Sequence, residues 1–141
     1  MKHVLLDTNI LLDAILDSRP HHGAALLILK AVRSKKLVAY TSTQSLLDLV
    51  YIYTKGNKSR VSEIGALMNK ICNDLIVCDT LKHHIVMAAS NYYDDFEDAV
   101  QTSIAIDNYC DLIISGDDGF DGSFGPPVVS PDAFCREYFE E

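Results

Sequence analysis

The stretch Val4-Leu5-Leu6-Asp7-Thr8-Asn9-Ile10-Leu11-Leu12 decides the fold, because three polar residues join an apolar run to a helical pattern. A short run of branched apolar residues predicts a buried strand. Asp, Thr and Asn favour helix starts, since their side-chain oxygens accept the unpaired amide hydrogens of the first turn. Asp7 is therefore predicted at the carboxyl end of a strand, where open α/β sheets bind their ligands. An ordinary helix cap would also explain Asp7, so its role depends on the rest of the chain.

The same alternation continues along the chain. Further strands are predicted at residues 37–40, 75–78, 112–114 and 126–129, and further helices at 24–34, 43–53, 59–73, 79–89, 96–109 and 131–139. Strands separated by helices, with no hairpin signal before residue 121, predict a three-layer α/β/α fold with a mainly parallel sheet of four to five strands. A chain of 141 residues without a linker or repeat is expected to form a single domain over residues 1–141.

Composition limits the function. Twelve Lys and Arg against twenty Asp and Glu give a net charge of −8, which excludes nucleic-acid binding by bulk charge over the whole surface. Any such contact must be local or helped by bound cations. The four cysteines form no CxxC pair and are predicted to be reduced. Without a secretory signal or an apolar run near ~20 residues, the protein is expected to be cytoplasmic, with no membrane segment.

Four aspartates occupy comparable places in the predicted fold. Asp7 follows the first strand and Asp117 follows the fourth. Asp48 lies in the helix after the second strand, and Asp98 lies near the start of the helix that precedes the fourth. Strand ends and helix starts of a parallel sheet meet at one edge, so a single crevice could hold all four carboxylates.

Such a cluster needs a cation. At ~4 Å and an effective dielectric constant of ~20, each carboxylate pair repels by roughly 4 kcal/mol. No Lys or Arg flanks these aspartates, and oxygen-only sites suit Mg²⁺ or Mn²⁺. Thr8, Asn9 and Ser115 could orient ligands or bound water. The chemistry of a carboxylate crevice with Mg²⁺ is phosphoryl transfer or phosphodiester cleavage.

Four segments together resemble a PIN domain of the VapC type, over about residues 2–138. They are Asp7-Thr8-Asn9, Ser42 to Val50, Asp95 to Ala99, and Ile114 to Asp117 followed by Phe120. The resemblance implies an Mg²⁺- or Mn²⁺-dependent endoribonuclease, commonly a homodimer, which is the toxin of a toxin–antitoxin pair and is held inactive by a small antitoxin. By the motif match, Asp7, Asp48, Asp98 and Asp117 take the catalytic and metal-binding positions, and Asn9 and Ser115 take the polar support positions.

Two departures leave alternatives open. The second acidic position is usually Glu, and here it is Asp48; the segment after the fourth strand often carries Arg, and here it has Gly116. Both would suit a catalytically weakened PIN-like protein that binds nucleic acid or regulates. A phosphatase of haloacid-dehalogenase type would need Asp where Asn9 stands. A receiver domain would need a late Lys, and no Lys follows Lys82.

Further residues carry separate expectations. Glu97, adjacent to Asp98, is expected to face solvent. Asp118 is expected to belong to a turn, with a role as a peripheral ligand as the alternative. Solvent exposure is also expected for Asp13, His21 and His22. The tyrosines 51, 53, 92 and 93 are candidates for base stacking. The third and fourth helices offer more apolar surface than one core face needs, through Tyr51, Ile52, Tyr53, Val61, Ile64 and Leu67. Ordinary core packing would also explain these residues, and the PIN resemblance favours association between two copies.

Overall fold

The computed structural model describes residues 1–91, 94–120 and 122–139. Within these residues five parallel strands form one sheet, in the order β3-β2-β1-β4-β5. The strands are β1 (His3–Leu6), β2 (Val38–Ser42), β3 (Ile76–Cys78), β4 (Leu112–Ile114) and β5 (Val128–Val129). The predicted parallel α/β/α architecture is confirmed.

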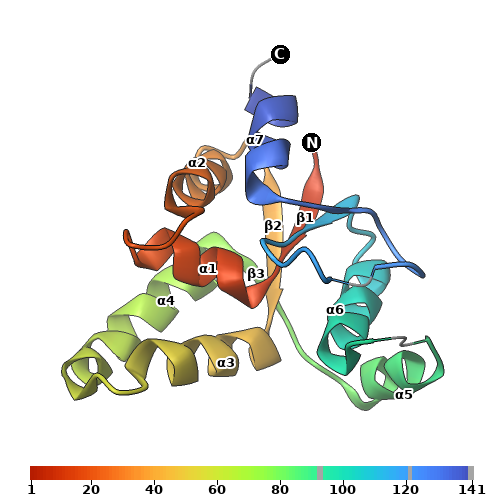
Figure 1. The fold of residues 1–141 in the computed structure, drawn as a ribbon, viewed down its shortest axis with the longest axis horizontal. Helices are drawn as coiled ribbons and strands as arrows, with labels where there is room; N and C mark the ends of the chain where they lie inside the picture. The colour runs from red at the N-terminus through yellow and green to blue at the C-terminus, as the bar shows by residue number, and fades with distance from the viewer. Residues whose placement is uncertain (92–93, 121, 140–141) are drawn as a thin grey trace.

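Helices cover both faces of the sheet (Figure 1). They are α1 (Thr8–Ile15), α2 (His22–Arg33), α3 (Thr43–Thr54), α4 (Ile64–Asp74), α5 (Lys82–Asn91), α6 (Phe96–Asp107) and α7 (Pro131–Phe139). Alternation along β1 separates two cores. Val4 and Leu6 pack among residues of α1 to α4 and α7, whereas Leu5 packs among residues of α5 and α6. The sheet is therefore buried on both faces, as a parallel sheet requires.

The position of β1 creates a crevice at the carboxyl edge of the sheet. β1 pairs with β2 on one side and with β4 on the other, and Leu6 lies opposite Ile114. The β1–β2 connection runs through helices on one face, and the β3–β4 connection runs through α5 and α6 on the other. Ligand sites of open α/β sheets form where connections diverge in this way.

Two predicted helix boundaries were wrong. The helix expected over residues 59–73 is divided into a 3₁₀ helix, η1 (Lys58–Glu63), and α4. Arg60 donates a hydrogen bond from Nη1 to the Tyr53 carbonyl, and the Tyr53 hydroxyl donates to Glu63, which holds η1 against the end of α3. The helix expected from Asp79 begins at Lys82; before it, the Thr80 amide donates to Thr43 Oγ1 and the Leu81 amide donates to His84 Nδ1.

Three polar residues expected at the surface are partly or fully buried. Asp13 is only 2% exposed, and its carboxylate accepts a hydrogen bond at 2.7 Å from Arg19 Nε. His22 Nδ1 lies 2.7 Å from the Asp13 carbonyl oxygen, and His21 Nδ1 lies 2.7 Å from Asp132 Oδ2. The turn between α1 and α2 is therefore held by polar contacts rather than left in solvent.

The apolar surface expected to join two copies is not one continuous patch. Tyr53 is only 8% exposed, while Ile64 and Leu67 pack against the larger core. Tyr51 and Ile52 are exposed, and both line a cleft. None of the helices in the described part of the chain is long and apolar enough to cross a membrane.

Candidate active site

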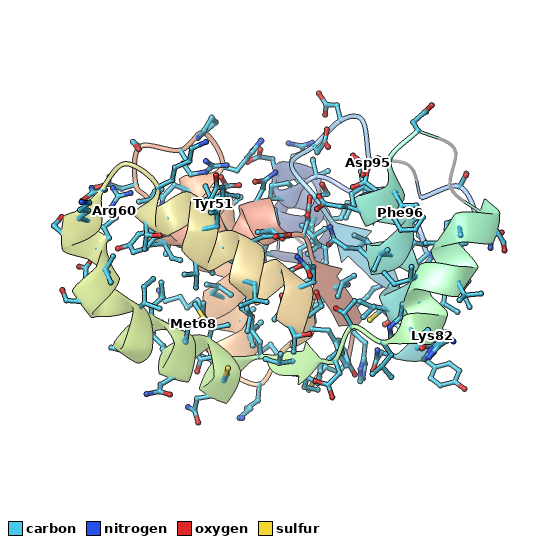
Figure 2. The ribbon with its side chains drawn as sticks, turned by 90° about the horizontal axis from the view of Figure 1, so that it is seen from below. Tyr51, Arg60, Met68, Lys82, Asp95 and Phe96 are labelled. Atoms are coloured by element: carbon cyan, nitrogen blue, oxygen red, sulfur yellow. The ribbon has the colours of Figure 1, made fainter. Side chains whose placement is uncertain are left out.

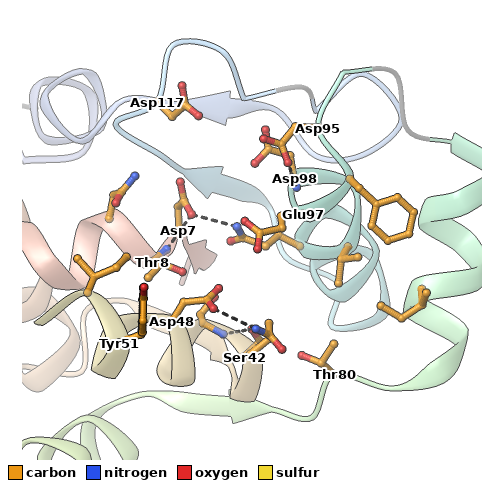
Figure 3. Close-up of a pocket in the computed structure, with 18 residues that line it drawn as sticks. Asp7, Thr8, Ser42, Asp48, Tyr51, Thr80, Asp95, Glu97, Asp98 and Asp117 are labelled. Carbon is orange, nitrogen blue, oxygen red and sulfur yellow. Dashed lines mark hydrogen bonds between the residues drawn. The ribbon is translucent and has the colours of Figure 1, made fainter. Parts of the chain in front are cut away.

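A cleft of about 550 Å³ opens at the carboxyl edge of the sheet (Figure 3). Its walls come from the start of α1, from α3, from the segment before α5, from α5 itself and from the first turns of α6. All four predicted aspartates line it, together with Thr8 and Asn9. We call it the acidic cleft, after its described carboxylates Asp7, Asp48, Asp95, Glu97, Asp98 and Asp117.

Asp7 lies in the middle of the acidic cleft and is held from three directions (Figure 3). Its Oδ1 accepts hydrogen bonds from the Thr8 amide at 2.8 Å and from Gln101 Nε2 at 3.0 Å. Its Oδ2 accepts one from Ser115 Oγ at 2.8 Å. The side chain is only 7% exposed, so these donors fix the direction of a nearly buried carboxylate. Asp7 is thus both the cap of α1 and a positioned group of the cleft.

Ser115 connects Asp7 to Asp117. Its hydroxyl donates to Asp7 and accepts a hydrogen bond at 3.1 Å from the Asp117 amide. The Asp117 carboxylate in turn accepts one at 2.9 Å from the Gly119 amide. Ser115 is 3% exposed and does not line the cleft, so it acts on the site by orienting two aspartates.

Asp48 and Asp98 enter the cleft from opposite helices. Asp48 projects from α3, where its Oδ1 accepts a hydrogen bond at 3.0 Å from Gln44 Nε2, one turn earlier. Asp98 stands in the first turn of α6 and is 6% exposed. Asp95 caps that helix, because its Oδ1 accepts a hydrogen bond at 3.2 Å from the Asp98 amide. This bond fixes the orientation of the first turn.

Two cleft residues on α6, Glu97 and Gln101, were missed from the sequence. Glu97 is exposed as expected, yet it lines the cleft. Partial burial raises the pKa of Glu97, and the charges of Asp48, Asp95 and Asp7 raise it further. Gln101 stands four residues after Glu97 and therefore on the same side of the helix. That spacing was the signal that could have found it.

The comparisons with known proteins identify the family of this chain. The sequence model of the PIN domain matches residues 3–119. The chain belongs to the PIN domain family. A curated relative, ribonuclease VapC1 of Aquifex aeolicus (strain VF5), is 23% identical over 141 residues, covering 96% of this chain and 94% of the relative.

Solved structures share the PIN fold of this chain at low identity. VapC20 of Mycobacterium tuberculosis, described as a sarcin–ricin loop cleaving toxin, aligns with a TM-score of 0.66 and 15% identity, covering 86% of this chain and 95% of that one. VapBC2 of Rickettsia felis, bound to a promoter DNA fragment, aligns with a TM-score of 0.63 and 16% identity, covering 91% and 98%. FitAB bound to a DNA fragment aligns with a TM-score of 0.66 and 12% identity, covering 91% and 94%.

The donor set of this PIN cleft fits a hard divalent cation. Six carboxylates line it, and none of the described lining residues is Lys, Arg or His. Gln101 Oε1 is buried without a hydrogen-bond partner in the described structure, which leaves one more neutral oxygen at the Asp7 side. Carboxylate, amide and water oxygens are the ligands that Mg²⁺ and Mn²⁺ prefer.

A second group of potential metal ligands lies outside the PIN cleft. The ligand atoms of His83, His84 and Asp107 lie within 4.8 Å of one another, and both imidazole Nε2 atoms face Asp107 Oδ2. His84 Nδ1 already accepts the Leu81 amide at 2.9 Å, so the neutral ring carries its proton on Nε2. That proton points at Asp107, and Nε2 has no lone pair to offer a metal. We therefore interpret His83, His84 and Asp107 as a structural contact that joins α5 to α6.

Proposed function

We propose that this protein is an Mg²⁺- or Mn²⁺-dependent endoribonuclease that hydrolyses RNA phosphodiester bonds in the acidic cleft. Asp7, Asp48, Asp98 and Asp117 are the proposed catalytic and metal-binding residues, supported by Thr8, Asn9 and Ser115. The observation that carries the proposal is a PIN cleft with six carboxylates and no described basic side chain. We also propose that residues 1–141 form one PIN-like domain.

The residues of the cleft have different proposed roles. Gln101 and Ser115 hold the two Asp7 oxygens in place before substrate arrives. Asp48, Asp98 and Asp117 add negative charge around Asp7 and attract a cation to this point. The carboxylates are also the groups able to accept the proton of an attacking water. A bound Mg²⁺ or Mn²⁺ would lower the pKa of that water and offset charge at the phosphate.

A catalytically weakened PIN-like binding or regulatory protein is the second candidate. Its support in the sequence is Asp48, where Glu is usual, and Gly116, where Arg is frequent. Asp48 lines the cleft despite its shorter side chain. A Cβ added at Gly116 would stand 3.0 Å from His21 Cδ2, and the His21 ring is held by Asp132. A glycine is therefore explained by close packing at this position, and neither residue argues for lost activity.

The test is cleavage of a short end-labelled single-stranded RNA in Mn²⁺ or Mg²⁺, with analysis of the product ends. Attack of water on phosphorus with loss of the 3′ oxygen leaves a 3′-hydroxyl and a 5′-phosphate. Attack by the ribose 2′-hydroxyl would instead leave a 2′,3′-cyclic phosphate. We expect the first pair of ends. Cyclic phosphate products would overturn the proposed mechanism, and intact RNA would favour the binding protein.

We further propose a cytoplasmic toxin controlled by a small antitoxin protein. Similarity to VapC1, VapC20, VapBC2 and FitAB supports this role. Expression of the protein alone should stop growth, and coexpression of a small protein encoded beside it should restore growth. Growth arrest that such a neighbour never relieves would count against the pairing.

We expect the protein to be a homodimer, as the PIN resemblance implies. Several apolar side chains outside the cleft are exposed, among them Leu47 at 68% on α3 and Val86 at 55% on α5. Burial of such side chains between copies is favourable at about 25 cal/mol per Å² of apolar surface. Light scattering at tens of micromolar should give twice the 15.6 kDa chain mass. A monomeric mass would contradict the dimer.

A further inference from the structure

Part of the lining of the acidic cleft is apolar and exposed. Tyr51 and Ile52 on α3, Ile85 on α5 and Phe96 on α6 all line it, with exposed fractions of 63%, 43%, 44% and 38%. Figure 2 labels Tyr51 on α3 and Phe96 on α6, and both residues line the cleft. A site that only binds a cation has no use for these side chains. They fit the substrate chemistry that surrounds the reacting phosphate.

A positive charge accompanies one of these aromatic rings. Lys55 Nζ lies 5.6 Å from the centroid of the Tyr51 ring, within the range of a cation–π contact. Lys55 is exposed and belongs to the segment that ends α3. The neighbouring Arg60 is already engaged, because its guanidinium stacks 4.8 Å over the Tyr53 ring and donates to the Tyr53 carbonyl. Lys55 is thus a basic group beside Tyr51, an exposed aromatic residue of the cleft, and lies just outside the lining, at the rim of the cleft.

Charge determines how a nucleic acid strand could enter. The cleft has six carboxylates and no described basic lining residue. Phosphates that flank the reacting one therefore find no positively charged side chain inside the cleft to bind them. The rim at Tyr51 and Lys55 offers what the floor lacks, a ring for a base and a cation for a phosphate. Aromatic rings with adjacent basic groups are how proteins bind single-stranded nucleic acids.

We propose that Tyr51 and Lys55 form a nucleotide subsite of the acidic cleft, where a base of single-stranded RNA stacks on Tyr51 and the adjacent phosphate contacts Lys55. The inference rests on the proposed function for the identity of the strand. Both faces of a paired base are covered by its neighbours in a helix, so Tyr51 can stack only on a base that is free of a duplex. The subsite therefore selects unpaired segments over duplex RNA.

Binding measured apart from cleavage tests the subsite. The probe is a single-stranded RNA decamer with one 2-aminopurine, titrated with protein in Ca²⁺, with anisotropy for affinity and fluorescence for stacking. Tyr51→Ala should weaken binding by about tenfold and remove the quenching of 2-aminopurine, while Tyr51→Phe should retain both. Lys55→Gln should reduce the slope of log affinity against log salt by about 0.7, the value for one phosphate contact to a single strand.

The controls are matched in chemistry and lie outside the cleft lining. Tyr109→Ala removes a tyrosine that is 89% exposed, and Lys30→Gln removes a surface charge on α2. Neither should change affinity, quenching or salt slope. Wild-type affinity in Tyr51→Ala, or equal affinity for a duplex of the same sequence, would overturn the subsite. So would a dimer that Tyr51→Ala dissociates, because Tyr51 would then belong to an interface between copies.

Failure of the subsite and failure of the proposed function give different results. If the decamer is never cleaved in Mn²⁺ but Tyr51→Ala loses binding and quenching, the subsite stands and the nuclease proposal fails. If the decamer is cleaved and Tyr51→Ala leaves both affinity and KM at wild-type values, the nuclease stands and the subsite fails.

Discussion

Removing divalent cations with EDTA should abolish RNA cleavage, and returning Mn²⁺ or Mg²⁺ in excess should restore it. The acidic cleft offers carboxylates, amides and hydroxyls but no described imidazole to activate a nucleophile. We therefore expect activity to depend on a cation that lowers the pKa of the attacking water. The measurement is the initial cleavage rate of a labelled RNA at increasing EDTA. Robust cleavage in excess EDTA, with contaminating ribonuclease excluded, would contradict the mechanism.

The same cations should stabilise the fold. Repulsion between cleft carboxylates opposes folding. It adds to partial burial, the larger cause, in raising the pKa of Glu97, and a bound cation offsets the repulsion. Binding to the folded state alone contributes about 2.7 kcal/mol when the free cation is at a hundred times its dissociation constant. We therefore expect Tm to rise with Mn²⁺ in the wild type and to rise less in Asp98→Asn.

His83→Gln is the control for this shift, because it disturbs the second ligand group while leaving the cleft intact. It should keep the wild-type response of Tm to Mn²⁺. A response that disappears in His83→Gln and persists in Asp98→Asn would place the cation at the joint between α5 and α6, outside the acidic cleft.

The main features of the site could be predicted from the sequence because they depend on strand ends. Asp7 and Ser115 directly follow β1 and β4, and Leu6 pairs with Ile114. Once the strands are placed, the geometry of a parallel sheet brings these positions together. Asp48 and Asp98 also line the cleft, because each lies on a helix that starts or ends near the same edge.

Other features depend on the rotation of each helix about its axis relative to the sheet. This rotation cannot be predicted from the local sequence pattern. Glu97 was expected to face solvent because it is adjacent to Asp98. It is exposed, but it also lines the cleft beside Asp98. Asp13 was expected at the surface of the first helix, but it is buried and its carboxylate accepts a hydrogen bond from Arg19. Tyr53 is buried by η1, which sequence periodicity could not distinguish from the start of α4. Tyr92 and Tyr93 lie outside the described residues.

Asp7 and Asp98 should respond differently to loss of charge. The Asp7 carboxylate accepts three hydrogen bonds while nearly buried, so Asp7→Asn places an amide donor against donors. Leaving a buried donor unsatisfied costs about 1–3 kcal/mol, so this variant should lose both activity and stability. Its phenotype alone could not separate a catalytic role from a structural one, which makes Asp98 the better residue to test.

Asp98→Asn should abolish cleavage while leaving the metal-free protein as stable as the wild type or more stable. The substitution keeps the shape of the side chain, so packing at the start of α6 should survive. It removes one negative charge from a crowded cleft, where each close carboxylate pair is unfavourable in the absence of a cation. It also removes a proposed metal ligand at the reacting phosphate, and losses of this kind typically reduce the rate by about 10²-fold or more.

Asp17→Asn is the matched control, because Asp17 is exposed, follows α1 and does not line the cleft. Asp132 is unsuitable, since it binds His21, whose ring packs against Gly116 beside Asp117. Cleavage rates and urea midpoints of both variants, with and without Mg²⁺, make the comparison. A structural carboxylate gives the opposite pattern, a lower urea midpoint with near wild-type cleavage. If Asp98→Asn behaves in that way while Asp17→Asn matches the wild type, Asp98 is a structural residue and the four-aspartate site is wrong.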